Sequence, residues 1–300
     1  MTTKVIVITG ASGFLGSALT VELAKNFNVY AIDIRKPSIK LKEKTPGVNW
    51  NILDISDKKA TIDLFEKIFQ RYGRIDFVIH LAAFWHFGTD YAIEYIKTNI
   101  EGTENIIDCC REKNCRRLIF ASTLSVLSET AKDEQLLEES NARSSLPYAV
   151  SKINCESMIV DASSSIPVAI VRIGSVFSEW CELPPLYSLI HHWSKRSFIG
   201  RIIPGKGHTG FPYIHRNDLV CLIIKIIDKN SKLNKCQWIL ASSSKTTTHN
   251  DIYPEIRKYM GVSKKNSPLF LPIWFVRAVL IFKFFLSRHW ELKFLKFEII

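Results

Sequence analysis

Short apolar runs rich in β-branched residues alternate with segments of helical periodicity along the chain as far as Arg172. Strands are expected at residues 4–9, 29–33, 50–53, 77–81, 117–121 and 168–172, and helices at 14–25, 58–71, 93–110 and 148–160. Between 58 and 71, for example, Ile62, Phe65 and Phe69 recur at the spacing of one helix face. Strands that alternate with helices of about 10–15 residues predict βαβ units. The expected fold class is therefore α/β, with a doubly wound parallel sheet.

The pattern weakens after residue 173. Residues 174–210 are rich in Pro, Gly, Trp and His, whereas 219–227 read as a helix and 237–240 as a strand. We expect residues 1–173 to form a nucleotide-binding domain, completed by segments at about 211–241 that return to the sheet. Residues 174–210 and 242–300 then form a smaller C-terminal substrate-binding or cap lobe over the carboxyl edge of the sheet, where doubly wound folds bind ligands.

A glycine-rich turn joins the first expected strand to the first expected helix. Gly10, Gly13 and Gly16 stand in the sequence GASGFLG. Glycines let the backbone approach a pyrophosphate, and a helix N-terminus offers free N–H groups and a partial positive charge. An ordinary glycine-rich turn is the plainer interpretation, but the position between strand and helix favours a dinucleotide site. The sheet is thus expected to be of Rossmann type.

An acidic residue ends the second expected strand. Asp33 lies about twenty residues beyond the glycines, where a carboxylate can accept hydrogen bonds from the adenosine ribose and repel a 2′-phosphate. Arg35 and Lys36 follow, and a cation there could hold such a phosphate or simply be solvated. We therefore expect NAD as the cofactor in preference to NADP.

Two further pairs of residues follow strands at the same edge of the sheet. Asp54 and Ile55 could flank an adenine ring, although Asp54 or Ser56 could equally cap the next helix. Ala82 and Ala83 are small enough to leave room for a cofactor, or could serve only in packing.

A tyrosine and a lysine four residues apart begin the helix at 148–160. Tyr148 and Lys152 therefore share a helix face. A tyrosine is a poor base near neutral pH, but a neighbouring ammonium lowers its pKa. The phenol can then exchange a proton with an alcohol or a carbonyl while a hydride moves to or from a nicotinamide. Ser122 or Thr123, after the fifth strand, could hold the substrate oxygen, and at least one of the two is expected only to cap the strand end.

Taken together, these residues resemble the extended short-chain dehydrogenases/reductases of the NAD-dependent epimerase/dehydratase type. The matching segments are TGASGFLG, LDI, HLAA, NIEGT, AST, PYAVSK, VRIGSVF and PYIHRNDL, in order between residues 4 and 240. The resemblance implies Thr123, Tyr148 and Lys152 as the catalytic group, with Thr123 matching better than Ser122. It also implies cofactor contacts by Phe14, Leu15, Asp33, Asp54, Ile55, Asn99 and Lys152.

Departures from the family pattern bear on the substrate. Nucleotide-sugar members usually carry Asn where this chain has Ser175, and Tyr-Gly where it has Phe177 and Ser178. The apolar stretch at 269–286 resembles the 3β-hydroxysteroid dehydrogenase-like branch, which acts on greasy alcohols and ketones. The main interpretation is an NAD-dependent oxidoreductase of secondary alcohols or ketones. The alternatives are a nucleotide-sugar epimerase or dehydratase with retained NAD, and a non-catalytic cofactor-binding scaffold.

Charge and cysteine content limit the other partners. The net charge is +11 without a zinc-finger, RRM-like or homeodomain-like pattern, so we expect a small-molecule substrate and no nucleic acid. The seven cysteines form no CxxC pair, and neither a disulfide framework nor a metal site is expected. The N-terminus shows no secretion signal, which predicts a cytoplasmic protein. Arg277 and Lys283 disfavour a membrane span at 269–286, which leaves a cap or peripheral membrane contact through 269–296, and a homodimer remains open.

Overall fold

The structure is a computed structural model that describes residues 3–86, 91–128, 135–261 and 267–276. The chain forms two compact units, of which the first comprises Met1–Gly174 and Arg216–Ala241 and the second Ser175–His215 and Ser242–Ile300. Residues 211–215, expected to return to the sheet, fall in the second unit instead.

The first unit contains a seven-stranded sheet in the order β11-β6-β5-β4-β1-β2-β3. Every neighbouring pair in it is parallel. The strands are β1 (Val5–Thr9), β2 (Asn28–Asp33), β3 (Asn49–Ile52), β4 (Phe77–His80), β5 (Arg117–Thr123), β6 (Val168–Ile173) and β11 (Cys236–Ala241). The strand order reverses at β1, which lies between β2 and β4, and ligands bind doubly wound sheets at such a switch point. The predicted Rossmann-type α/β fold is confirmed.

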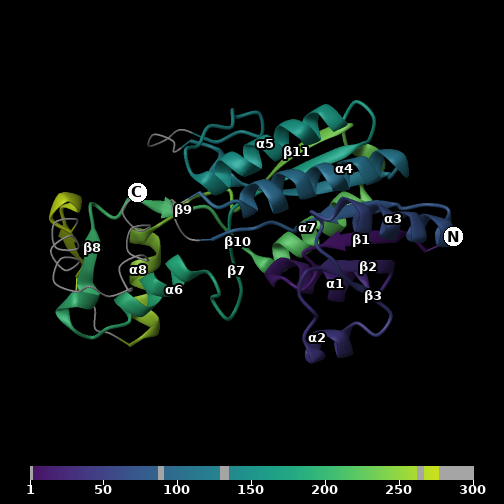
Figure 1. The fold of residues 1–300 in the computed structure, drawn as a ribbon. Helices are drawn as coiled ribbons and strands as arrows, with labels where there is room; N and C mark the ends of the chain where they lie inside the picture. Colours follow the sequence, from purple (N-terminus) through teal and green to yellow (C-terminus); the bar gives the residue numbers. More distant parts are fainter. Residues whose placement is uncertain (1–2, 87–90, 129–134, 262–266, 277–300) are drawn as a thin grey trace. The chain divides into compact units, whose positions relative to one another are not determined.

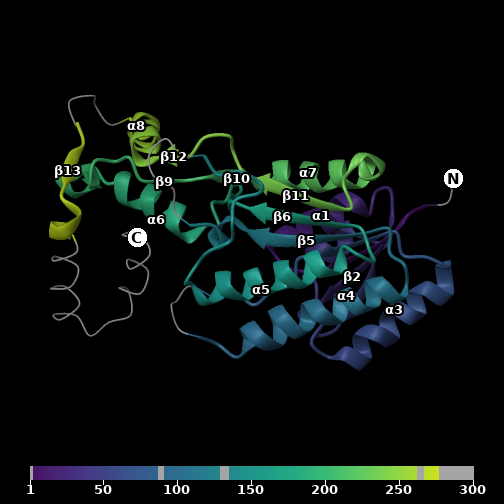
Figure 2. The same ribbon diagram turned by 90° about the horizontal axis from the view of Figure 1, so that it is seen from above.

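Helices cover both faces of this sheet (Figure 1). On one face lie α1 (Phe14–Leu23) and α7 (Arg216–Asp228), and Figure 2 shows the other face covered by α3 (Lys58–Tyr72), α4 (Gly102–Glu112) and α5 (Pro147–Ala162). The short helix α2 (Ile39–Lys44) follows β2, and the 3₁₀ turns are η2 (Leu124–Val126) and η4 (Asn230–Lys232). The sequence predicts one α-helix over 93–110, but the structure begins this segment with a π-helix, η1 (Tyr95–Glu101). π-Helical turns are rare and occur frequently at functional sites.

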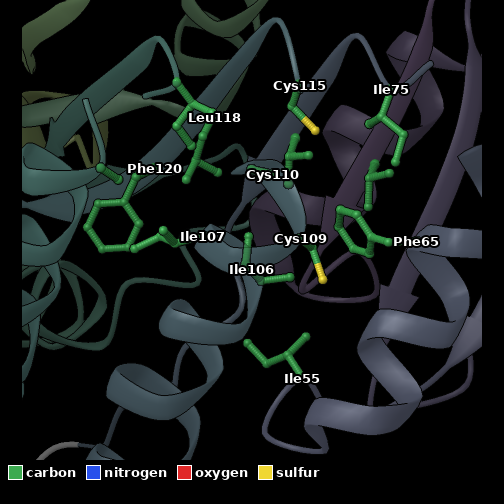
Figure 3. Close-up of a cluster of buried hydrophobic side chains, with 14 of the residues drawn as sticks. Ile55, Phe65, Ile75, Ile106, Ile107, Cys109, Cys110, Cys115, Leu118 and Phe120 are labelled. Carbon is green, nitrogen blue, oxygen red and sulfur yellow. The ribbon is translucent and has the colours of Figure 1, made fainter. Parts of the chain in front are cut away.

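Buried apolar side chains fill the space between the sheet and helices α3 to α5 (Figure 3). Phe65 of α3 and Phe120 of β5 are both fully buried. Cys109, Cys110 and Cys115 belong to the same cluster, and burial raises the pKa of the Cys109 thiol to about 12. These cysteines therefore act as small apolar residues of the core.

The second unit has its own small core. It comprises α6 (Pro184–Trp193), α8 (His249–Tyr259), the 3₁₀ turn η3 (Phe198–Arg201) and three strand pairs. The pairs are β7 (Ser175–Phe177) with β10 (Tyr213–His215), β9 (Gly210–Phe211) with β12 (Thr247–Thr248), and β8 (Ile202–Pro204) with β13 (Leu269–Leu271). Trp193 is fully buried and meets the Tyr253 ring edge-on at 5.7 Å.

The apolar stretch at 269–286 is described only in part. Its first residues form strand β13, and residues 277–286 lie outside the described residues. Within the ranges that the structure describes, every helix is too short or too polar to cross a membrane.

Candidate active site

The turn between β1 and α1 requires glycine where the backbone folds tightly on itself. Gly10 has a φ of +69°, which side-chain-bearing residues rarely adopt, and a Cβ on Gly16 would lie 2.0 Å from the Gly10 carbonyl oxygen. A Cβ on Gly13 would meet only that oxygen, at 3.1 Å, and Arg35 Nη2, at 3.7 Å. Gly13 is the N-cap of α1, and no side chain caps the helix there. Phe14 and Leu15 thus begin a helix whose first N–H groups can bind a pyrophosphate.

Asp33 is fixed at the carboxyl end of β2. Its side chain is buried, Oδ2 accepts a hydrogen bond from Ser12 N at 2.8 Å, and Oδ1 accepts one from Arg35 N at 2.9 Å. Arg35 Nε also lies 3.5 Å from Oδ1. Each carboxylate oxygen can accept a second hydrogen bond, so the position suits a ribose hydroxyl.

A cavity of about 790 Å³ lies on the outer side of this turn, within the first unit. Its wall includes Ser12, Arg35, Lys36 and Arg216, and the Arg216 guanidinium lies 5.1 Å from the Phe14 ring centroid. Room for a further anionic group therefore exists beside Asp33, among cations.

The segment after β3 differs from the expected capping. Asp57 caps α3 by accepting a hydrogen bond from Ala60 N at 3.0 Å, so neither Asp54 nor Ser56 is the N-cap. Asp54 Oδ1 instead accepts from Ser56 N at 2.9 Å. A short Asx turn at Asp54 therefore precedes α3, which begins only after Asp57.

Ile55 is part of the core. Its side chain is 3% exposed, and a Cβ on Gly102 would lie 2.7 Å from its Cδ1. Asn105 Nδ2 donates to the Ile55 carbonyl oxygen at 2.9 Å. A cofactor contact by Ile55 stays a prediction, and so does one by Asp54.

The segment after β4 lies against the glycine turn. A Cβ on Gly10 would come within 2.8 Å of Ala82 N, which itself donates to Thr9 Oγ1 at 3.2 Å. Ala82 and Ala83 are both half-buried. The close approach of the Ala82 backbone thus requires glycine at position 10, and a cofactor contact by Ala82 or Ala83 stays a prediction.

Asn99 holds two segments of the site together. Its Oδ1 accepts from Phe84 N at 2.7 Å, and its Nδ2 donates to Phe84 O at 3.1 Å and to Ser151 Oγ at 2.8 Å. Ser151 Oγ in turn donates to the Tyr148 carbonyl oxygen at 2.7 Å. A cofactor contact through the Asn99 amide group would have to share one of these bonds, so its clearest role is to fix the start of α5.

Lys152 carries a buried ammonium. Its side chain is 3% exposed, and its Nζ lies 4.0 Å from the Phe120 ring centroid. It forms no hydrogen bond with the residues that the structure describes. Burial is the main cause that lowers the pKa of Lys152 to about 8. This ammonium lies over an aromatic face and has no hydrogen-bond acceptor among the described residues. It is therefore suited to donate a hydrogen bond to a ligand hydroxyl.

Tyr148 occupies the first turn of α5, one turn before Lys152. Burial raises the pKa of its phenol. His80 of β4 interacts through both ring nitrogens, with Thr9 Oγ1 at 2.7 Å and Thr103 Oγ1 at 2.9 Å. Burial lowers the pKa of His80 to about 3, so it stays neutral.

Ser122 and Thr123 belong to β5 itself, which the sequence predicts to end at residue 121. Ser122 is buried and its Oγ donates to Glu156 Oε1 at 2.6 Å. Thr123 Oγ1 accepts from Ser125 N at 3.2 Å and caps η2. The Ser122 hydroxyl is therefore occupied by Glu156, whereas Thr123, at the end of the strand, is partly accessible.

The described residues contain no hydrogen bond that joins Thr123, Tyr148 and Lys152 directly. Helix α5, which carries Tyr148 and Lys152, packs on β5 and η2, which Thr123 joins, and a shared catalytic role of the three residues stays a prediction. Sequence reasoning misses His80, Ser151, Glu156 and Arg172 as supports of the site. Within the described part of the chain, no group of three or more His, Cys, Asp or Glu is placed to hold a metal ion.

Replacing Lys152 with Met should stabilise the fold. The Lys152 pKa falls from 10.5 to about 8 in the folded chain, which corresponds to about 3 kcal/mol at 1.36 kcal/mol per unit. The unfolded state binds more protons between these values, so unfolding free energy of the natural protein should rise with pH from about 8 to 10.5. Urea unfolding of Lys152→Met should show higher stability at pH 7 and no such rise. Destabilisation at pH 7 would mean that Lys152 is structural.

The comparisons with known proteins agree on one family. A dTDP-D-glucose 4,6-dehydratase of Dictyostelium discoideum is 29% identical over 253 residues, which cover 75% of this chain and 55% of the relative. The chain spans about half the length of the first curated relatives it matches.

Solved structures share the fold. A UDP-N-acetylglucosamine 4-epimerase from Methanobrevibacter ruminantium, in complex with UDP-N-acetylmuramic acid, has a TM-score of 0.71 at 22% identity and covers 91% of this chain and 86% of its own. A UDP-glucuronic acid 4-epimerase from Bacillus cereus, in complex with UDP-glucuronic acid and NAD, has a TM-score of 0.68 at 22% identity, with 89% and 86% covered. The profile of the NAD dependent epimerase/dehydratase family matches residues 6–239. The chain belongs to the NAD dependent epimerase/dehydratase family.

Proposed function

We propose that this protein binds NAD and transforms the sugar of a nucleotide sugar, with Tyr148 as the acid/base group. One observation carries the proposal: Lys152 is a buried ammonium without an acceptor among the described residues, one helical turn from Tyr148. Burying such a charge is costly unless a ligand uses it. The glycine turn and the braced Asp33 lie in the same compact unit.

The residues fit NAD as follows. Gly10, Gly13 and Gly16 with the start of α1 would hold the pyrophosphate, and Asp33 the adenosine ribose. Lys152 would donate to a ribose hydroxyl near the nicotinamide. NAD supplies a hydride acceptor that can later return the hydride.

The protein's own groups would then move the proton. Thr123 Oγ1 would hydrogen-bond to a sugar hydroxyl and hold it near Tyr148. The Tyr148 phenolate would take the proton of that hydroxyl while the carbon loses hydride, and a ketone results. Burial raises the pKa of Tyr148, and the Lys152 ammonium, one helical turn away, would favour the phenolate by opposing that rise. Because the hydride would pass to bound NAD and come back from it, Tyr148 would return the proton at the end of the reaction; reduction of the ketone from its opposite face would give an epimer, and loss of water before reduction would give a keto-deoxy sugar.

The relatives favour this substrate class over the general dehydrogenase that the sequence departures at Ser175 and Phe177 suggest. The named relatives act on dTDP- and UDP-linked sugars. Ser175 and Phe177 form β7 in the second unit, so the departures fall in the expected substrate lobe, not in the cofactor unit. Assignment of the second unit to substrate binding stays a proposal.

Product analysis tests the function. The purified protein is unfolded to release and identify bound cofactor, and the native protein is incubated with UDP-glucose, UDP-N-acetylglucosamine and dTDP-glucose. We expect released NAD and, by mass spectrometry, either an isomerised sugar or one that has lost water, without net NADH. Net NADH formation with simple secondary alcohols would favour the dehydrogenase. NAD binding without turnover of any nucleotide sugar would favour the scaffold.

A further inference from the structure

A buried ion pair lies beneath the proposed reacting groups. Glu156 of α5 and Arg172 of β6 are each 3% exposed. Arg172 Nε donates to Glu156 Oε1 at 3.1 Å and Nη2 donates to Oε2 at 3.0 Å, which is the two-point geometry of a strong pair. Ser122 Oγ donates to the same Oε1 at 2.6 Å. Because Ser122 directly precedes Thr123, this hydrogen bond links the ion pair to β5, the strand that carries Thr123.

Arg172 also binds the loop of residues 135–146, which is the described part of the segment before α5. Its Nη1 donates to Ser140 O at 2.8 Å and to Glu138 O at 3.3 Å. Its guanidinium carbon lies 4.3 Å from the Trp238 ring centroid, so stacking fixes its plane. Every hydrogen bond that the structure describes for this guanidinium is donated to Glu156 or to this loop.

The same loop is hydrogen-bonded to the residues that follow β5. Ala142 forms a β-bridge with Leu127, and Arg143 N donates to Val126 O at 2.7 Å. Val126 ends η2, which Thr123 caps, and Pro147 begins α5 shortly after the loop. A loop displaced at Ser140 would therefore move both sides of the proposed site.

Glu156 lies one helical turn after Lys152. The other titratable groups near Lys152 are Tyr148 and Cys155 on the same helix and His80 on β4. Burial raises the pKa of the Tyr148 phenol and of the Cys155 thiol and lowers that of His80 to about 3, so all three are neutral near pH 7. The ion-paired Glu156 is thus the negative charge near this ammonium.

We propose that Glu156 and Arg172 are positioning residues of the active site: Arg172 holds the loop between Thr123 and Tyr148, and Glu156 supplies the countercharge of Lys152. The proposal rests on the proposed function only in taking these three residues as the reacting groups. Neither positioning residue touches substrate or cofactor. Both would act through the groups that they hold.

The loop is tested with Arg172→Lys, which keeps the charge beside Glu156 but loses the planar grip on two carbonyls. Hydrogen exchange of the protein without added ligand should show backbone amides of residues 138–143 exchanging about ten-fold faster or more. Turnover should fall by about ten-fold, since small misplacements of reacting groups are costly.

The matched control is Arg117→Lys. Arg117 is also buried, on β5, and its Nη1 donates to Val168 O at 2.6 Å and Asn234 O at 2.9 Å, away from the loop. It should lower stability but leave exchange at 138–143 and turnover unchanged. Equal loop exchange in Arg172→Lys and the natural protein would overturn the loop part of the proposal. Because exchange needs no turnover, this result is independent of the proposed function.

The countercharge is tested with Glu156→Gln, read out as the pH dependence of unfolding. Without the carboxylate, the pKa of Lys152 should fall further, so the rise of unfolding free energy that begins near pH 8 in the natural protein should begin about one pH unit lower. Adding Lys152→Met should remove the rise, which assigns it to Lys152. An unshifted rise would overturn the countercharge role. Should Arg172 left unpaired prevent folding, Glu156→Gln with Arg172→Gln removes both charges; the rise should still begin at a lower pH but by less than in Glu156→Gln, because the cation that opposes Lys152 is lost as well.

Discussion

Tyr148→Phe is expected to lose at least about 10²-fold in turnover of a nucleotide sugar, while NAD binding is largely retained. The change removes one hydroxyl and keeps the ring, and general acid–base groups commonly contribute about 10²- to 10⁴-fold. The Tyr148 ring lies 6.4 Å from the Tyr95 ring centroid, and the phenylalanine can keep this packing. Initial rates and NAD affinity, measured on the same preparations, separate chemistry from binding.

Tyr91→Phe is the control for this prediction. Tyr91 is 64% exposed and its ring neighbours Tyr95, so the same atom is removed close by without a proposed role in catalysis. We expect its rate to match that of the natural protein. A Tyr148→Phe variant with near-normal turnover would exclude Tyr148 as the acid/base group, whatever the substrate.

Much of the first unit can be predicted from the sequence, because its signals are local. A strand buried on both faces must be a continuous apolar run, and β1 (Val5–Thr9) is fully buried along its length. The residues of the glycine turn lie within a few positions of one another in the sequence, and so do Tyr148 and Lys152. Their chemistry follows from strand, turn and helix without knowledge of the rest of the fold.

The supports of the site depend on contacts between distant segments. Asn99 reads as an ordinary helix residue, yet it bonds to Phe84 and to Ser151. Arg172 lies near the end of the apolar strand β6, and its partners on α5 and in the loop at Ser140 lie far from it in the sequence. Periodicity cannot report such pairs, since each partner looks like an ordinary polar residue of its own element.

Local exceptions explain the missed boundaries. Strand β5 continues to Thr123 because Ser122 and Thr123 pair with β6, and the buried Ser122 hydroxyl is satisfied by Glu156. The π-helix at Tyr95–Glu101 has no periodic signal of its own. Helix α8 carries Pro254 in its interior, and its main sequence signal is the capping box of Thr248 and Asp251.

Asp33→Ala is expected to shift cofactor preference from NAD toward NADP by about 10²-fold. A hydrogen bond to a charged group contributes about 1.5–3 kcal/mol, so NAD should bind roughly 10- to 100-fold more weakly once the carboxylate is gone. NADP should bind more tightly for a different reason. Its 2′-phosphate no longer meets a buried negative charge, and the Arg35 guanidinium, whose Nε lies 3.5 Å from Asp33 Oδ1, is released to face it.

The space for that phosphate is already present. Ser12, Arg35 and Lys36, together with Glu22, line the cavity of about 790 Å³ in the first unit. Titration of both nucleotides at one fixed ionic strength measures the ratio, since salt screens the phosphate contact.

The double variant Asp33→Ala with Arg35→Ala separates the two causes. It should keep the loss of NAD affinity but lose most of the gain in NADP affinity, because the gain depends on the freed guanidinium whereas the loss depends on the missing carboxylate. If Asp33→Ala also loosened the turn through its lost bonds from Ser12 N and Arg35 N, both nucleotides would weaken together in the single variant. A natural protein that binds NADP more tightly than NAD would contradict the role of Asp33 itself, since a buried carboxylate at the end of β2 cannot favour a second negative charge.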